Sequence, residues 1–318
     1  MTNTRAIVTG AHGFIGRHAA RRLAELGYEV AGIGHGSWDR CEWQEWGLQH
    51  WHATDVSLSS LVKHAELPAI IVHCAGSGSV SFSFQNPLQD FNRTVLSTVG
   101  VLEYVRSVSP ATKIVYPSSA GVYGIAETLP IAESTACDPI SPYGVHKLIA
   151  ENMISSYCYS FGIAACIVRY FSIFGCGLRK QLLWESCQKL SVGDNNFMGT
   201  GLEVRDWLHI DDAVELLVVA KEHASSLCPI VNGGTGEGTT VREILNYIAT
   251  LTAPVGVVPN FSDRKREGDP ASYVANITRA IEWGWAPSTH WRSKIRAYVD
   301  WWHKENARKL ASSLITRA

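Results

Sequence analysis

The feature that most constrains the fold is a glycine-spaced loop between an apolar run and an amphipathic run near the N-terminus. Residues 5–9 are mostly apolar and β-branched, which predicts a short buried strand. Gly10, Gly13 and Gly16 follow, and the run 14–26 has helical spacing. A strand, a tight glycine turn and a helix form the first half of a βαβ dinucleotide site, where the helix N-terminus binds a pyrophosphate. The spacing is G-x-x-G-x-x-G rather than G-x-G-x-x-G, and a glycine turn that binds nothing is the alternative.

Further strand and helix patterns extend this unit into an α/β fold. Strands are predicted at 5–9, 28–33, 48–53, 69–74, 112–117 and 163–168, and helices at 14–26, 87–107 and 143–161. This alternation predicts a Rossmann-like, doubly wound parallel sheet with helices on both faces. After Phe174 the chain becomes glycine-rich and less regular. We therefore expect a dinucleotide-binding domain at 1–172, to which 205–225 returns, and a smaller C-terminal substrate-binding lobe at 173–318.

A second constellation lies at the start of the predicted helix 143–161. Tyr143 and Lys147 are four residues apart, which places both side chains on one face of a helix. Ser141 suits the N-cap and Pro142 the first helical position, so the pair is expected in the opening turns. A lysine ammonium beside a phenol lowers the phenol's pKa from about 10, and such a tyrosine can exchange a proton at neutral pH. The pair alone is weak evidence, since this spacing is common. Together with the glycine loop it predicts redox chemistry at a carbinol carbon.

Composition excludes several other classes of protein. The chain has 28 Lys and Arg against 29 Asp and Glu, a formal net charge of -1, which gives no electrostatic signature of nucleic-acid binding. No run of 18 apolar residues and no signal-peptide pattern is present, so we expect a cytoplasmic protein without a membrane partner. The 8 cysteines form no C-x-x-C pair and are expected to be reduced thiols. His50 and His52 have no third ligand nearby, and no metal site is predicted.

These motifs together resemble those of the extended short-chain dehydrogenases/reductases, in the NAD(P)-dependent epimerase/dehydratase family that acts on nucleotide sugars. The similarity runs nearly end to end. Besides the glycine loop and the Tyr143/Lys147 pair, it rests on Pro-Ser-Ser-Ala-Gly-Val-Tyr-Gly at 117–124, Arg-Tyr-Phe-Ser at 169–172, Arg-Asp-Trp-Leu-His-Ile-Asp-Asp at 205–212 and Arg-Glu-Gly-Asp-Pro at 266–270. Each motif is weak alone, but their order and spacing are specific together.

The resemblance implies roles for individual positions. Ser119, Tyr143 and Lys147 are the expected catalytic residues. The expected cofactor-binding residues are Gly10, His12, Gly13, Phe14, Ile15, Gly16, Gly34, His35, Asp55, Val56, Ala75, Thr94, Tyr143, Lys147 and Tyr170. The expected substrate-binding residues are Ser119, Ser172, Arg205 and Arg266, with the two arginines clamping the diphosphate of a nucleotide-diphosphate sugar. Thr94 and Ser172 stand where the family often has asparagine, so the sugar contacts differ from the family pattern.

The resemblance also implies a homodimer formed through the helices 87–107 and 143–161. In related proteins these two helices build a four-helix interface between subunits. A purely intramolecular role in the core is the alternative for both segments.

The end of the predicted second strand bears on the cofactor. In NAD-binding relatives an acidic residue there binds the 2′-hydroxyl of the adenosine ribose. This chain has Gly34 at that position, followed by His35, with Arg40 close behind. A carboxylate would repel a 2′-phosphate, whereas this set would accommodate one. We therefore expect NADP(H), with NAD(H) as the alternative.

Two redox reactions and one non-catalytic role fit these residues. Sugar dehydratases of the family carry an Asp-Glu pair where this chain has Ala120 and Gly121, which argues against a dehydratase. The missing ribose-binding acid favours a dissociable NADPH. We therefore expect NADPH-dependent reduction of a 4-keto-6-deoxy nucleotide sugar at C4, through Ser119, Tyr143 and Lys147. The first alternative is an NAD-dependent nucleotide-sugar 4-epimerase, and a remote one is a dinucleotide-binding sensor without activity.

Overall fold

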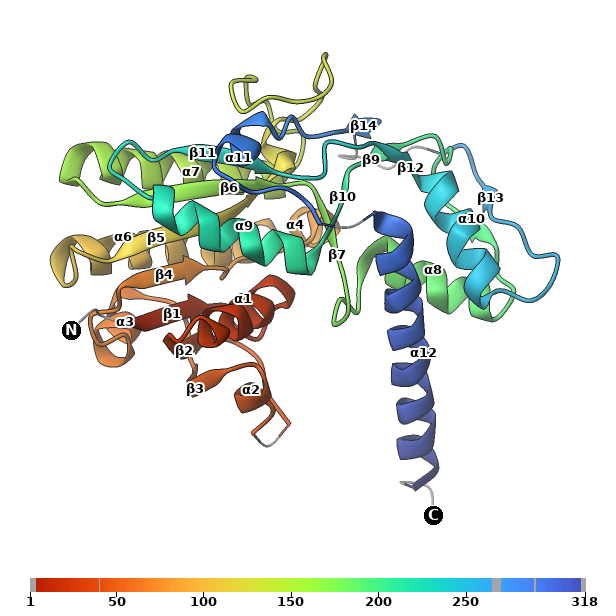
Figure 1. Cartoon of the computed structure of the whole chain (residues 1–318), viewed down its shortest axis with the longest axis horizontal. Coiled ribbons are helices and arrows are strands. Elements are labelled where there is room, and N and C mark those ends of the chain that lie inside the picture. The colour runs from red at the N-terminus through yellow and green to blue at the C-terminus, as the bar shows by residue number, and fades with distance from the viewer. Residues whose placement is uncertain (1–3, 40, 265–269, 289, 316–318) are drawn as a thin grey trace.

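The structure is a computed structural model that describes residues 4–39, 41–264, 270–288 and 290–315. Its centre is a seven-stranded parallel sheet in the order β11-β6-β5-β4-β1-β2-β3 (Figure 1). These strands are β1 (Arg5–Thr9), β2 (Glu29–Gly34), β3 (Leu48–Ala53), β4 (Ile70–His73), β5 (Lys113–Ser119), β6 (Ala165–Tyr170) and β11 (Ile230–Gly233). The strand order reverses between β1 and β4, and ligands of such sheets bind beside this switch point.

Helices cover both faces of the sheet, as the doubly wound prediction requires. The helices α1 (Phe14–Glu25) and α9 (Ile210–His223) share one apolar cluster, and α3 (Leu58–His64), α6 (Ser97–Ser107) and α7 (Pro142–Phe161) share another. Within β1, Ala6 and Val8 join the first cluster whereas Ile7 joins the second. This alternation follows from the two-residue period of a strand, and it explains why the buried strands are apolar throughout. The predicted fold class is confirmed.

Helix α7 begins and ends where its sequence predicts. The hydroxyl oxygen of Ser141 accepts a hydrogen bond from the Gly144 N–H at 3.2 Å, and Pro142 is the first helical residue. The helix ends at Gly162, whose φ of 70° is in the left-handed region that glycine tolerates. This N-cap fixes Tyr143 and Lys147 in the first two turns.

The single helix predicted at 87–107 consists of three parts. These are α5 (Pro87–Phe91), a π-helical turn at Asn92–Leu96, and α6. The hydroxyls of Ser97 and Thr98 each donate to a carbonyl four residues earlier at 2.6 Å, which supplies extra bonds in this wide turn. π-turns within helices are frequent at functional sites. Thr94, one of the predicted cofactor residues, lies inside this one.

A third apolar cluster is built from buried residues at Phe174 and beyond, including Trp184, Leu245 and Tyr298. The strands outside the main sheet are β7 (Ser172–Phe174), β8 (Asn196–Phe197), β9 (Val204–Arg205), β10 (Trp207–His209), β12 (Thr239–Thr240), β13 (Asn260–Phe261) and β14 (Ser272–Tyr273). The further helices are α2 (Glu42–Glu45), α4 (Val80–Gln85), a 3-10 turn at Ala120–Val122, α8 (Gln181–Ser191), α10 (Val241–Thr252), α11 (Thr278–Glu282) and α12 (Trp291–Ile315), and α12 extends away from the rest of the chain (Figure 1).

The return to the main sheet is longer than predicted. We expected it to end at residue 225, whereas β11 lies beside β6 and so carries the return to Gly233. The pattern of this strand was not recognised in the sequence because only Ile230 and Val231 are apolar, and Asn232 and Gly233 complete it. Among the described residues no helix has the length and apolar character needed to cross a membrane. All 8 cysteines are free thiols, as expected.

Candidate active site

The three predicted catalytic residues come together at the carboxyl edge of the sheet. Ser119 is the last residue of β5, and Tyr143 lies in the first turn of α7. Gly121 lies between the two side chains and close to both. A Cβ atom at Gly121 would lie 3.3 Å from Ser119 Oγ and 3.6 Å from a ring carbon of Tyr143. The Ser119 hydroxyl and the Tyr143 ring therefore border one small space, where a sugar hydroxyl could meet both.

The two residues that follow Ser119 carry no acid. Gly144 of α7 approaches so near that a Cβ atom there would lie 2.5 Å from the Gly121 carbonyl oxygen. A Cβ atom at Gly121 would be tight against Ser119 Oγ and in ordinary van der Waals contact with the Tyr143 ring. Ala120 and Gly121 stand where dehydratases carry their Asp-Glu pair, so these two positions supply no carboxylate for dehydration.

Lys147 is buried one turn further along α7. Its Nζ donates a hydrogen bond to the Pro117 carbonyl at 2.9 Å and lies 4.6 Å from the centre of the Tyr116 ring. Burial lowers the pKa of Lys147 to about 8, and the neighbouring Cys74, Glu151 and Asp90 oppose this effect. The ammonium therefore remains largely charged at neutral pH but titrates much closer to neutrality than an ordinary lysine.

The electrostatics of Tyr143 differ from the sequence prediction. We expected the Lys147 ammonium to lower the pKa of this phenol. In the structure burial raises the pKa of Tyr143 above its usual value, a hydrogen bond with Ser119 opposes the rise, and the charge of Asp90 adds to it. The prediction fails because Lys147 is directed at the Pro117 carbonyl, a backbone partner that the sequence does not reveal.

The glycine loop has the shape that a dinucleotide requires. Gly10 has a φ of 66°, and a side chain on Gly16 would collide with the Gly10 carbonyl, so α1 packs directly on the loop. Gly13 is the N-cap of α1 and contributes no side chain, and the first turn carries no acid. The first N–H groups of α1 can thus hold a pyrophosphate, and His12, Phe14 and Ile15 lie in the same loop and turn. The residues present fit the dinucleotide that the motif predicts.

At the end of β2 the structure adds a contact that the sequence did not suggest. His35 Nε2 lies 2.5 Å from Oδ1 of Asp55, and both side chains are exposed. Gly34 has a φ of 154° and lies against Gly10. His35 was expected to attract a 2′-phosphate, but a carboxylate already faces it. Arg40, which was expected to help accommodate the 2′-phosphate, lies outside the described residues.

The remaining predicted cofactor residues lie at different depths. The Ala75 N–H donates to the Thr9 hydroxyl at 3.1 Å, and the Ser77 N–H donates to Thr94 Oγ1 at 3.3 Å, so both segments border the switch point. Val56 follows Asp55 and packs partly against the core. Tyr170 is buried and donates its hydroxyl to the Ala213 carbonyl at 2.6 Å, so its phenol is directed into α9 rather than toward the site.

The predicted substrate contacts are only partly described. Arg205 is buried, and its Nη1 donates to the carbonyls of Val204 at 2.8 Å and Ala271 at 3.3 Å. Ser172 begins β7, and its N–H donates to the Asp206 carbonyl at 2.9 Å. Arg266 lies outside the described residues, so the predicted arginine clamp is described at one of its two positions.

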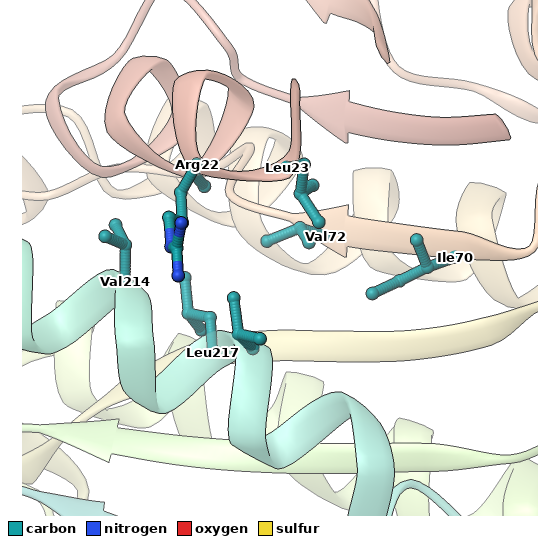
Figure 2. A pocket seen from close by; sticks show the side chains of 8 residues that line it. Arg22, Leu23, Ile70, Val72, Val214 and Leu217 are labelled. Atoms are coloured by element: carbon teal, nitrogen blue, oxygen red, sulfur yellow. The ribbon is translucent and has the colours of Figure 1, made fainter. Parts of the chain in front are cut away.

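One enclosed cavity lies elsewhere, between α1, α9 and the sheet (Figure 2). Apolar residues such as Leu23, Val72, Val214 and Leu217 line it, together with Arg22. Its accessible space of about 10 Å³ holds at most one water molecule, so it is a packing gap and not a ligand site. No cluster of His, Cys, Asp or Glu that could bind a metal occurs in the described part of the chain.

Comparison with known proteins agrees with this geometry. The model of the NAD-dependent epimerase/dehydratase family matches residues 6–232. The chain belongs to this epimerase/dehydratase family. The UDP-glucose 4-epimerase of Azospirillum brasilense is 29% identical over 308 residues, which span 89% of this chain and 87% of the relative. That of Rhizobium meliloti is 27% identical over 330 residues, with 96% and 99% covered. The crystal structure of Thermus thermophilus UDP-glucose 4-epimerase in complex with NAD matches with a TM-score of 0.83 at 27% identity, covering 94% of this chain and 99% of that one.

Membership of the epimerase/dehydratase family confirms the predicted family and the prediction of an NAD(P)-dependent enzyme that modifies nucleotide sugars. The comparisons favour the epimerase alternative, and they do not support the reductase that we expected first. They agree with an NAD-dependent family and show no preference for NADP.

A buried ion pair and a buried acid–histidine pair were missed in the sequence. Arg169 Nη2 donates to Glu151 Oε2 at 2.7 Å, and Ser118 Oγ donates to Glu151 Oε1 at 2.5 Å. In the second pair, Asp90 Oδ2 lies 2.5 Å from His146 Nδ1. The sequence held no clear signal for Asp90, because residues 87–91 mix polar and apolar side chains and an acid is common in the first turn of a helix.

Proposed function

We propose that this protein is an NAD-dependent 4-epimerase of a UDP-sugar. The observation that carries the proposal is the space shared by the Ser119 hydroxyl and the Tyr143 ring beside Gly121, with the buried Lys147 one turn along the same helix as Tyr143. The relatives that cover nearly the whole chain and are named UDP-glucose 4-epimerases supply the substrate class. A dehydratase is disfavoured by Ala120 and Gly121, and a sensor has no need of the catalytic set.

Each side chain has a separate task in this reaction. Ser119 orients the C4 hydroxyl of the sugar by hydrogen bonding. Tyr143 accepts the proton of that hydroxyl when the carbon is oxidised, and it returns the proton when the opposite face is reduced. Lys147 holds the ribose of the dinucleotide, and the nicotinamide, when bound, accepts and returns the hydride. Since the loop at Gly10 and the proposed arginine clamp at Arg205 and Arg266 hold phosphates, much of the acceleration arises from positioning.

The same proposal takes NAD rather than the NADP(H) expected from Gly34. Asp55 already pairs with His35 at the end of β2, and a carboxylate there opposes a further phosphate by charge repulsion. The pair can instead offer hydrogen bonds to ribose hydroxyls, in place of the missing acid at Gly34. An epimerase also needs no exchange of its cofactor, because the hydride taken from the sugar is returned to it.

The proposal predicts interconversion of a UDP-sugar pair without added cofactor. The purified protein is incubated with UDP-glucose, UDP-galactose, UDP-N-acetylglucosamine or UDP-glucuronate, and the products are identified by NMR. We expect one pair to reach the same ratio from either side, with no net change in absorbance at 340 nm, and NAD to be released on denaturing the protein. Consumption of NADPH by a 4-keto nucleotide sugar, with no isomerisation, would instead establish the reductase.

We also propose the predicted organisation into lobes and a dimer. The dinucleotide domain comprises 1–172 together with 205–233, and the other segments form the substrate lobe. Exposed apolar side chains on α5, the π-turn and α7 support a homodimer through these helices, and they are Leu88, Leu96, Val145, Tyr159 and Phe161. Sedimentation of the purified protein should give twice the mass of one chain, and a monomer at micromolar concentration would contradict the dimer.

A further inference from the structure

A buried acid–histidine pair lies beside the proposed catalytic residues without being part of them. Asp90 is fully buried in α5, and its Oδ2 lies 2.5 Å from Nδ1 of His146 on α7. Its other oxygen, Oδ1, is also buried and has no hydrogen-bond partner among the described residues. A carboxylate buried with a single partner is costly, so its retention calls for a role other than stability.

The position of His146 links this pair to the site. It lies three residues after Tyr143 and directly before Lys147 in the first turns of α7, and it packs edge-on against Phe91, the last residue of α5, with 5.4 Å between ring centres. Near Tyr143, the Ser83 hydroxyl of α4 accepts the Tyr143 N–H at 3.0 Å. The helices α4 and α5 therefore hold the turn that carries both catalytic side chains, and Asp90 faces that turn.

The other titratable groups described near Lys147 are either neutral or paired with a cation. Burial raises the pKa of Cys74 to about 12, so it stays a neutral thiol while Lys147 titrates. Burial also raises the pKa of Tyr116 well above its usual value, and it lowers that of His73 to about 3, so both are neutral. Glu151 is matched by the guanidinium of Arg169 at 2.7 Å. Asp90 remains as the carboxylate whose hydrogen-bond partner among the described side chains is the imidazole of His146 and not a guanidinium or an ammonium.

We propose that Asp90, paired with Nδ1 of His146, is a positioning residue whose charge sets the pH range in which Tyr143 and Lys147 work. A negative charge favours the protonated form of each neighbour, the phenol and the ammonium alike. The direction agrees with the structure, since Asp90 raises the pKa of Tyr143 and opposes the lowering for Lys147. Removing the charge should lower both pKa values together.

The test is the pH profile of Asp90→Asn, which keeps the shape of the side chain and removes its charge. Both limbs of the profile of kcat/KM should move to lower pH by about one unit, because an opposite or like charge at close range shifts a pKa by about that amount or more. The alkaline limb of dinucleotide affinity, measured by tryptophan fluorescence, should move in the same direction, since it depends on Lys147 alone. The matched control is Asp300→Asn, because Asp300 is an exposed acid on α12. This substitution should shift neither the pH profile of kcat/KM nor that of dinucleotide affinity.

Two substitutions of His146 separate charge from packing. His146→Leu leaves the Asp90 carboxylate without a donor, so the carboxylate should take up a proton and the profile should shift as in Asp90→Asn. His146→Asn restores a donor near the position of Nδ1 and should return the limbs toward those of the unaltered protein. If Asp90→Asn lowers the plateau but leaves both limbs in place, Asp90 is a structural residue and the proposal fails.

The activity readout rests on the proposed epimerase, whereas the dinucleotide titration does not. If the unaltered protein isomerises no nucleotide sugar, the proposed function fails and the affinity profile still decides the role of Asp90. If isomerisation occurs and neither profile moves in Asp90→Asn, only the inference about Asp90 is overturned.

Discussion

Tyr143→Phe is expected to reduce kcat by about a thousandfold, the range in which a positioned acid–base group contributes, while dinucleotide affinity stays within about threefold. The substitution removes the hydroxyl that meets the sugar oxygen beside Ser119. It keeps the ring that packs on Gly121, so the fold of the turn should be unchanged. Initial rates with the UDP-sugar that turns over, together with fluorescence titration of the dinucleotide, measure the two effects.

The matched control for this substitution lies away from the site. Tyr28 directly precedes β2 at the amino edge of the sheet, opposite to the edge that carries Ser119, and Tyr28→Phe should leave kcat unchanged. A fall of less than tenfold for Tyr143→Phe would show that another group carries the proton. A large loss of dinucleotide affinity would show that the phenol binds the cofactor instead.

Glu151→Gln is expected to lower the free energy of unfolding by about 3 kcal/mol, because it leaves a buried guanidinium without its counter-charge. Arg169 and Glu151 are both at most 5% exposed and are joined by hydrogen bonds of 2.7 and 3.1 Å. Glutamine keeps the volume of the side chain but turns one acceptor oxygen into a donor that faces the arginine. Urea denaturation followed by circular dichroism measures the change.

An exposed pair provides the control for this second substitution. Glu25 lies 3.4 Å from Arg22 on α1 and is more than half exposed, so Glu25→Gln should change stability by less than about 1 kcal/mol. Equal losses in the free energy of unfolding for the two substitutions would mean that the buried ion pair stabilises the fold no more than the solvent-exposed one. In that case the position of β6 against α7 would depend on apolar packing alone.

The sequence predicted the parts of the fold that repeat a simple period. The strands at β1 to β6 and the helices α1 and α7 follow from apolar runs, glycine turns and an N-cap, all of which are local. The π-turn at Asn92–Leu96 was missed because one inserted residue does not alter the apolar pattern enough to be seen. The strand β11 was missed because its sequence Ile-Val-Asn-Gly holds only two apolar residues, and its pairing with β6 is visible only in the folded chain.

The same distinction holds for the candidate site. The positions of Ser119, Tyr143 and Lys147 could be predicted because each lies at the end of a regular element. Their electrostatics could not, since Lys147 bonds a backbone carbonyl of β5 and Asp90 approaches from another helix. For the cofactor, Gly34 suggested room for a phosphate, and only the folded chain places Asp55 beside His35. The charged groups that set the pKa values and the cofactor preference of the site thus belong to segments that are distant in the sequence.

The most direct test of the central claim is the fate of a deuterium atom at C4 of the UDP-sugar substrate. The sugar labelled at that carbon is converted to equilibrium in ordinary water, and the product is examined by NMR and mass spectrometry. We expect the epimer to keep the deuterium at C4, because the hydride leaves and returns within one site while Tyr143 exchanges only the hydroxyl proton. Replacement of the deuterium by solvent hydrogen would contradict this claim.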